Sequence, residues 1–495
     1  MLGWNSKGSL PMAAGGPAPS PALPVGTRTM QGGTTGSQVS ALRTAWERWQ
    51  TPALALADQA VVSGASFLTT VLISYWTTPS LLGIYTIGIS VLVSMLAIQG
   101  SLISLPYTIQ RHQPLSTPNE HAGSSLAHCG LLSTLGVVVL AVTALVLSAR
   151  GSGSELTATA WMLAAAAPFA LLREFGRRFA FAHLNMGRAL MLDMAVAAIQ
   201  LLALCWLGWT GRMSAANAYA AIGGACALTG IVWLYLARTN FVIRAHQVRA
   251  TMKQSWGLGK WLFALQITVS VQACIPYWLL ALGAGTTATG VYAACMSIVL
   301  FANPLMIGIG NTMAPKAALA LKEGGYARLR REVTQDSLLL GAAMTLFALV
   351  ILFTGEDLMG LLYHSKEYAG HGQTVMVLAL AQLASALGMP ATNALQAMER
   401  PQAIVWASSG GAVLTVVLVW CLMIDWGLSG AAYGFLAGNA AGAVGRWVAL
   451  LTLVPRRGPH LGREADPTMG QACRIEALGS TERVCSSNAV VGRSS

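Results

Sequence analysis

The chain has 495 residues, of which 55% are hydrophobic and only 10% are charged, and its net charge is +12. Because a soluble domain carries about 25% charged residues, this composition excludes a water-soluble enzyme or binding domain. The basic charge does not indicate a nucleic-acid partner. The Lys and Arg residues lie in short segments between apolar stretches, which is the pattern of membrane orientation.

Residues 1–45 are rich in Gly, Pro, Ser and Thr and are predicted to form a disordered cytoplasmic tail. Stretches of about 20 apolar residues follow, which is the length that crosses a bilayer. There are twelve of them, at about 54–76, 82–104, 128–147, 156–172, 190–209, 215–237, 261–282, 289–312, 336–354, 371–389, 403–424 and 428–450. Residues 455–495 are polar and basic and are predicted to form a second disordered cytoplasmic tail.

The distribution of Lys and Arg predicts the orientation. With the N-terminus inside, 27 of the 30 basic residues lie in inside segments, and only Arg150, Arg212 and Lys366 lie outside. An excess of Lys and Arg marks the cytoplasmic side. We therefore predict an all-α integral membrane protein with about twelve spans and both termini in the cytoplasm.

The first and second apolar stretches carry the first candidate residues. Asp58 and Gln59 lie about two turns into the first stretch. Asp58 could bind a proton or a cation, or it could orient an arginine. The alternative is an acid that is stabilised by the helix dipole near the N-terminus of the helix. Arg111 follows the second stretch as a single basic residue on the inside. Charged groups within spans are costly and are functional candidates for that reason.

The fourth stretch ends in a cluster of basic residues. Arg173 and Arg177 are four residues apart and share a helix face, Arg178 lies beside them, and Glu174 is placed to pair with Arg178. The alternative to a binding role is ordinary anchoring of the inside end by positive charge.

The seventh stretch has a polar face. It begins at Lys260 and carries Gln266 and Ser270 on one side, with Gln272 and Pro276 further along. This pattern fits the lining of a cavity, and interhelical hydrogen bonding is the alternative.

Two glycine patterns concern the packing of the helices. The segments Leu82-Gly83-Ile84-Tyr85 and Thr289-Gly290-Val291-Tyr292 place similar residues 207 positions apart, which indicates a parallel repeat of six segments plus six. In the last stretch, glycines at every fourth position predict a bare ridge that lets another backbone approach closely. These are Gly430, Gly434, Gly438 and Gly442.

Other classes are disfavoured by what the chain lacks. The eight cysteines form no metal-binding or disulfide pattern, and there is no phosphate-binding loop for a nucleotide-driven pump. The longest outside loop, at about 355–370, is too short for a catalytic domain. We expect no enzyme activity, cofactor or metal.

Several segments resemble those of bacterial polysaccharide flippases of the Wzx type, in the multidrug/oligosaccharidyl-lipid/polysaccharide exporter superfamily. The similarity is diffuse, covers roughly residues 54–450, and is strongest in the first half. The matching segments are Ala57–Thr69 (ADQAVVSGASFLT), Gly83–Tyr85, Ile103–Tyr107 and Arg173–Ala182 (REFGRRFAFA).

The resemblance implies a fold like that of multidrug and toxin extrusion (MATE) antiporters, with six-helix lobes at 54–237 and 261–450 around a central cavity. It implies a flippase of the bacterial inner membrane that moves an undecaprenyl-diphosphate-linked oligosaccharide by alternating access. The implied partners are the lipid-linked oligosaccharide, membrane lipid, a polysaccharide polymerase and a chain-length regulator. Lipid II flippases of the same group have fourteen spans, so the peptidoglycan precursor fits less well.

A diphosphate cargo needs Arg or Lys, and its glycan needs a polar cavity. We therefore predict that the cargo is bound by Arg111, Arg173, Arg177, Arg178, Lys260, Gln266 and Gln272, and that ion coupling uses Asp58 and Gln59. Three alternatives remain open: a cation-coupled multidrug antiporter of the same fold, a membrane enzyme acting on lipid-linked sugars, and a scaffold of polysaccharide assembly.

Overall fold

The computed structural model describes residues 34–110, 117–363 and 366–454, and in these ranges it contains helices and no strand. The chain divides into two compact units, Met1–Gln50 and Thr51–Ser495. In the first unit the helix α1 (Thr34–Trp76) begins at Thr34, so the prediction of disorder over residues 1–45 is wrong for residues 34–45. Beyond Gly36 the sequence is free of Gly and Pro up to Thr51 and is rich in helix-forming Ala, Leu, Arg and Gln.

The first lobe contains six membrane-crossing segments, α1 and those that follow it. They are α2 (Pro79–Gln99), extended by η1 (Gly100–Ser104) and α3 (Leu105–Gln110), then α4 (Pro118–Ala149), α5 (Ser154–Ala182), α6 (Met186–Trp209) and α7 (Ala215–Ala237), which ends in η2 (Arg238–Asn240). Local signals set the boundaries. Asn185 and Ser214 cap α6 and α7 by accepting a backbone N–H through their side chains.

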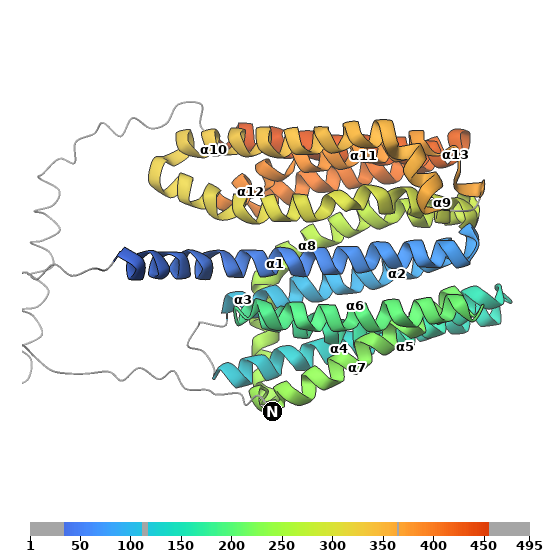
Figure 1. The fold of residues 1–495 in the computed structure, drawn as a ribbon, viewed down its shortest axis with the longest axis horizontal. Helices are drawn as coiled ribbons and strands as arrows, with labels where there is room; N and C mark the ends of the chain where they lie inside the picture. Colours follow the sequence, from blue (N-terminus) through green and yellow to red (C-terminus); the bar gives the residue numbers. More distant parts are fainter. Residues whose placement is uncertain (1–33, 111–116, 364–365, 455–495) are drawn as a thin grey trace, which may run out of the picture. The chain divides into compact units, whose positions relative to one another are not determined.

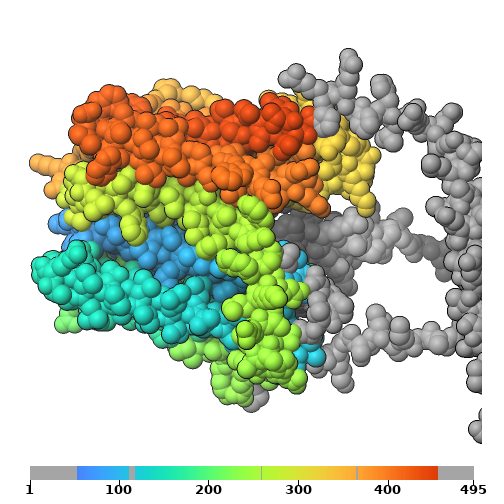
Figure 2. Space-filling model, turned by 180° about the vertical axis from the view of Figure 1, so that it is seen from behind, coloured from blue at the N-terminus to red at the C-terminus, as the bar shows by residue number. Residues whose placement is uncertain are grey.

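The second lobe begins with α8 (Ala245–Gly283). The elements after it are α9 (Gly285–Val299), η3 (Leu300–Ala302), α10 (Asn303–Leu362), η4 (Lys366–Tyr368), α11 (Gly372–Leu387), α12 (Met389–Ala397) and α13 (Pro401–Leu453). Figure 2 shows α8 running along one face of the molecule between the cyan α4 and the orange helices of the second lobe.

Ten helical stretches of the described chain are long and apolar enough to cross a membrane, and two of them, Gly285–Leu362 with 78 residues and Pro401–Leu453 with 53, are long enough to cross it twice. The 53 residues of α13 would extend about 80 Å as one straight helix, far beyond a hydrocarbon layer of about 30 Å. Gly427 (φ 54°) in α13 and Gly325 (φ 59°) in α10 adopt positive φ and interrupt the helices. Figure 1 shows α10 turning back on itself. With two crossings in each of these two stretches, the described residues give the predicted number of twelve.

The glycine ridge packs as the sequence predicted. It lies against the first half of α13, where a Cβ added at Gly434 would lie 2.5 Å from the Val419 nitrogen. At Gly438 an added Cβ would lie 1.8 Å from Thr415 Oγ1. These contacts leave no room for a side chain, so the two halves of α13 form a hairpin with touching backbones.

The repeated glycines also meet, at the crossing of α2 with α9. A Cβ added at Gly83 would lie 1.9 Å from the Thr286 carbonyl oxygen, and one at Gly290 would lie 1.8 Å from the Pro79 carbonyl oxygen. The hydroxyls of Ser80 and Thr286 are 2.6 Å apart beside them. The repeat therefore marks a place where the backbones of the two lobes touch. We call this end the glycine end, and the opposite end, at which the turns 183–185, 238–244 and 398–400 lie, the basic end.

Candidate functional site

The core of the first lobe contains a cluster of buried charges from three helices. Arg177 on α5 lies 2.6 Å from Asp58 Oδ2 on α1, through Nη2, and 2.7 Å from Asp193 Oδ2 on α6, through Nε. Arg173 Nη2 lies 2.5 Å from Asp193 Oδ1. Both aspartate side chains are fully buried. Arg177 and Arg173 are only 9% and 15% exposed.

Glu174 and Arg178 complete this ion-pair cluster. Arg178 Nε lies 2.7 Å from Glu174 Oε1, which confirms the predicted pair, and Glu174 is also within 4 Å of Arg173 and Arg177. The ion-pair cluster, defined as Asp58, Arg173, Glu174, Arg177, Arg178 and Asp193, has three positive and three negative groups and is neutral when all are ionised. A buried charge is tolerated only when it is paired, so the arginines and carboxylates hold each other in place.

The equal numbers of positive and negative groups limit which ligands the ion-pair cluster can bind. Arg173 and Arg177 already have carboxylate partners, so a diphosphate would have to displace Asp58 or Asp193 to bind them. Asp58 Oδ1 is buried and has no hydrogen-bond partner within the described ranges. Protonation of Asp58 would leave Arg177 with less compensating charge, so the arrangement is able to link a bound proton or cation to the packing of α1, α5 and α6. Of the three roles that the sequence left open for Asp58, orientation of an arginine is therefore present.

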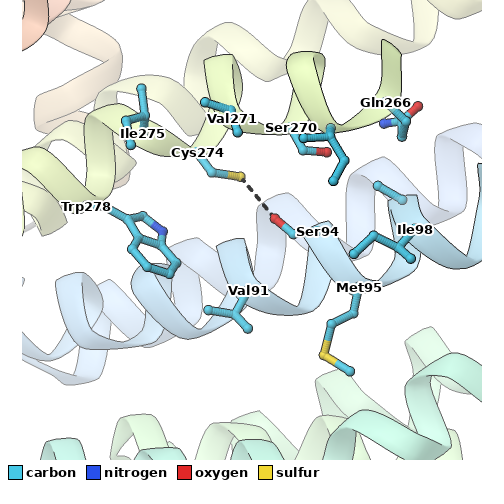
Figure 3. A pocket seen from close by; sticks show the side chains of 12 residues that line it. Val91, Ser94, Met95, Ile98, Gln266, Ser270, Val271, Cys274, Ile275 and Trp278 are labelled. Atoms are coloured by element: carbon cyan, nitrogen blue, oxygen red, sulfur yellow. Dashed lines mark hydrogen bonds between the residues drawn. The ribbon is translucent and has the colours of Figure 1, made fainter. Parts of the chain in front are cut away.

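A cavity of about 320 Å³ lies between the lobes, and we call it the α2–α8 gap. Figure 3 shows Gln266, Ser270 and Cys274 on α8 facing Ser94 on α2, with the Ser94 hydroxyl 3.9 Å from the Cys274 sulfur. Gln266 and Ser270 thus line a cavity, as their shared face predicted. The remaining lining residues are apolar: Val91, Met95, Ala97, Ile98, Ile267, Val271, Ile275 and Trp278.

A second cavity between the lobes, of about 340 Å³, is the α1–α10 gap. It lies between α1 and the region where α9 passes through η3 into α10. Its polar lining residues are Ser63, Ser66, Thr70, Ser297 and Asn303. Neither gap is lined by Asp, Glu, Lys, Arg or His.

The two gaps are related by the sequence repeat. Gln59 and Ser63 on α1 lie 207 residues before Gln266 and Ser270 on α8, the same spacing that separates the two glycines of the α2–α9 crossing. Gln59 Nε2 donates to Ser63 Oγ at 3.2 Å. Among the hydrogen bonds of the described residues, the predicted ion-coupling residue Gln59 is bonded within α1 and not to the ion-pair cluster. The shared Gln-x-x-x-Ser pattern was visible in the sequence, and its serine on α1, Ser63, lines the second gap.

Comparisons with known proteins agree with this architecture. Residues 262–421 match the MatE family model. A solved inward-facing structure of a multidrug resistance MATE family transporter of the MOP superfamily superimposes with a TM-score of 0.67 at 14% identity, covering 86% of this chain and 99% of that one. The chain has the MATE transporter fold.

Two further structures have this MATE fold. One is an outward-facing multidrug resistance MATE family transporter, with a TM-score of 0.63. The other is a MOP superfamily transporter from Pyrococcus furiosus, described as having a binding pocket of reverse polarity that suggests a different function, with a TM-score of 0.61. Each is 13% identical, and each alignment covers 81% of this chain and 94% of that one. Curated protein sequences gave no match.

Other predicted site residues lie elsewhere in the MATE fold. Lys260 is exposed where the spanning part of α8 begins, and Gln272 lines neither of the two gaps between the lobes. Arg111 lies outside the described residues. Arg446 in α13 is not among the predicted site residues. It packs against Gly388, and its Nε is buried without a hydrogen-bond partner among the described residues.

Proposed function

We propose that this multi-pass membrane protein exports a lipid-linked oligosaccharide, of the undecaprenyl diphosphate class, across the bacterial inner membrane. The observation that supports the proposal is the lining of the two gaps between the lobes. It combines apolar surface with neutral hydrogen-bonding groups and has no charged side chain.

Neutral amides and hydroxyls are the groups that suit a glycan. Gln266, Ser270 and Ser94 in the α2–α8 gap can exchange hydrogen bonds with sugar hydroxyls, and Ser63 and Asn303 can do so in the α1–α10 gap. A cationic drug would instead favour an acidic lining. The buried acids of the first lobe, Asp58 and Asp193, are neutralised by arginines.

The lipid tail and the diphosphate have separate places in this proposal. Ile267, Val271 and Trp278 line the α2–α8 gap and are 39%, 40% and 43% exposed, so a tail could rest there while its end stays in the bilayer. At the basic end, Lys260 is exposed and Arg178 is 48% exposed, which leaves both accessible to a diphosphate. An inside-negative potential favours export of such an anion by about 2.3 kcal/mol per charge per 100 mV.

Reconstitution tests the proposal directly. The purified chain is placed in proteoliposomes with a fluorescent prenyl-diphosphate oligosaccharide, and loss of signal to a membrane-impermeant quencher reports movement between leaflets. Faster movement than in protein-free liposomes, further increased by an imposed potential, is expected. No acceleration would overturn the proposal. Co-purification with a polymerase or a chain-length regulator would identify the expected partners.

A cation-coupled multidrug antiporter is the second candidate. The ion-pair cluster favours it, because Asp58 and Asp193 are buried acids whose occupancy by a proton or Na⁺ would change the packing of three helices. Ethidium efflux from vesicles, driven by a proton or Na⁺ gradient and lost in Asp58→Asn, is the expected result for this candidate. Gradient-driven prenyl-lipid movement that is lost in the same variant, without ethidium efflux, would instead support an ion-coupled flippase.

A further inference from the structure

The first part of α8, before its spanning part begins at Gly259, has an exposed basic face. His246, Arg249 and Lys253 are exposed at positions i, i+3 and i+7, whereas Thr251 and Ser255 on the other face are buried. Residues 238–260 carry five Lys or Arg residues and no Asp or Glu. This segment is therefore an amphipathic helix with charge of one sign, placed at the basic end between the lobes.

The segment is fixed to the first lobe. Arg244 Nη1 lies 2.8 Å from Glu120 Oε1, and the Val242 N–H donates to the Asn119 carbonyl at 3.0 Å. The His128 ring lies 2.9 Å from the Val248 carbonyl. These bonds to α4 hold the basic face in one orientation relative to the first lobe.

Two adjoining hollows lie on this surface. The basic hollow is a shallow, open surface on α8 that is lined by His246, Arg249, Ala250, Met252, Lys253 and Trp256. The apolar groove, of about 280 Å³, lies between α4 and α8. Met252 and Trp256 line both, and Leu131 and Leu135 of α4, 62% and 60% exposed, form the far wall of the groove.

The positive charge of the basic hollow is not neutralised by acidic side chains in its lining. Arg249 and Lys253 form no ion pair within the described ranges, and no acidic residue lines either hollow. A ligand that fits both hollows has an anionic head and an apolar tail. Basic clusters beside transmembrane helices on the cytoplasmic side attract anionic lipid headgroups for this reason.

We propose that this surface is a binding site for an anionic phospholipid of the leaflet at the basic end. Its phosphate lies on Arg249 and Lys253, and one acyl chain lies in the apolar groove along Leu131, Leu135 and Trp256. The Trp256 ring, 54% exposed, lies where head and tail meet, as aromatic side chains do at the membrane interface. The site is separate from the gaps between the lobes and does not depend on the identity of the transported cargo.

Native mass spectrometry of the full chain in detergent tests the site with phosphatidylglycerol as the probe. The variant Arg249→Gln/Lys253→Gln removes two exposed charges, and its affinity is expected to fall about thirty-fold. The matched control is Arg330→Gln/Arg331→Gln, which removes two exposed charges from α10 outside both hollows and is expected to keep the affinity. Leu135→Asn is expected to weaken binding, because it replaces an apolar side chain of the groove with a polar one.

Three results would overturn this site. The first is an equal loss of affinity in the α10 control, which would mean non-specific attraction to positive charge. The second is equal binding of phosphatidylethanolamine. The third is binding of a prenyl diphosphate without binding of phosphatidylglycerol, which would assign the surface to the cargo.

Discussion

The two lobes share one repeated plan but hold their helices together by different means. In the first lobe, α1, α5 and α6 meet at the buried ion-pair cluster. In the second lobe, the halves of α13 meet through bare glycine backbone, and the partly buried Arg446 forms no ion pair with a described residue. Charge pairing responds to a bound proton or cation, whereas backbone packing does not. If transport is coupled to an ion, we therefore expect the ion-pair cluster of the first lobe to respond to it.

Removal of the central cation is expected to have the largest effect. Arg177→Leu leaves Asp58 without its cation in a fully buried position, and a broken buried pair costs about 3–5 kcal/mol. The midpoint of thermal unfolding in detergent measures the loss. Arg178→Leu, at a half-exposed position, is the control and should cost about 1 kcal/mol or less.

Charge balance can be tested in the same background. Arg177→Leu/Asp58→Asn has equal numbers of positive and negative groups in the ion-pair cluster and is expected to recover part of the lost stability. If the double variant is no more stable than Arg177→Leu, packing of the arginine side chain, and not its charge, holds the lobe together.

The second lobe is tested by a pair of glycines on the same ridge. Gly438→Ala places a methyl group 1.8 Å from Thr415 Oγ1 and should cost about 1–3 kcal/mol by overpacking. Gly442→Ala has its nearest neighbour at 3.7 Å and should be tolerated. Equal unfolding midpoints for the two variants would contradict the close contact within α13.

The contact between the lobes is tested at the glycine end. Gly83→Ala meets the Thr286 carbonyl at 1.9 Å, so α2 and α9 must move apart at a cost of about 1–2 kcal/mol. Gly130→Ala on α4, with no atom within 4 Å of the added Cβ, is the control. A cysteine pair at Ser80 and Thr286 should cross-link more slowly in the Gly83→Ala background, and an unchanged rate would speak against the contact.

The smallest effect concerns the lining of the α2–α8 gap. Gln266→Leu removes one neutral hydrogen-bonding group and should lower transport about two- to ten-fold, since such a bond contributes about 0.5–1.5 kcal/mol. Gln272→Leu, on the same helix but outside the gap, should leave transport near its normal rate. The proteoliposome assay compares the two, and an equal loss in both would remove Gln266 from the cargo pathway.

Features that lie within a single helix could be predicted from the sequence. The spans depend on the length and hydropathy of one apolar stretch, and the Glu174–Arg178 pair and the glycine ridge depend on the periodicity of one helix. The Asp58–Arg177 pair joins residues 119 positions apart, and its existence depends on how α1 packs on α5. The charged residues could therefore be identified from the sequence, whereas the partners of Arg173 and Arg177, which are carboxylates of the same lobe and not an external anion, could not.

The crossing of α2 and α9 has the form of a homodimer interface. Gly83 contacts the carbonyl of Thr286 while Gly290 contacts the carbonyl of Pro79, and a shift of 207 residues converts each contact into the other. Such reciprocity is the signature of an isologous contact across a two-fold axis. It is the geometry that duplication and fusion of a six-helix ancestor would leave, if that ancestor paired with its own copy through this glycine.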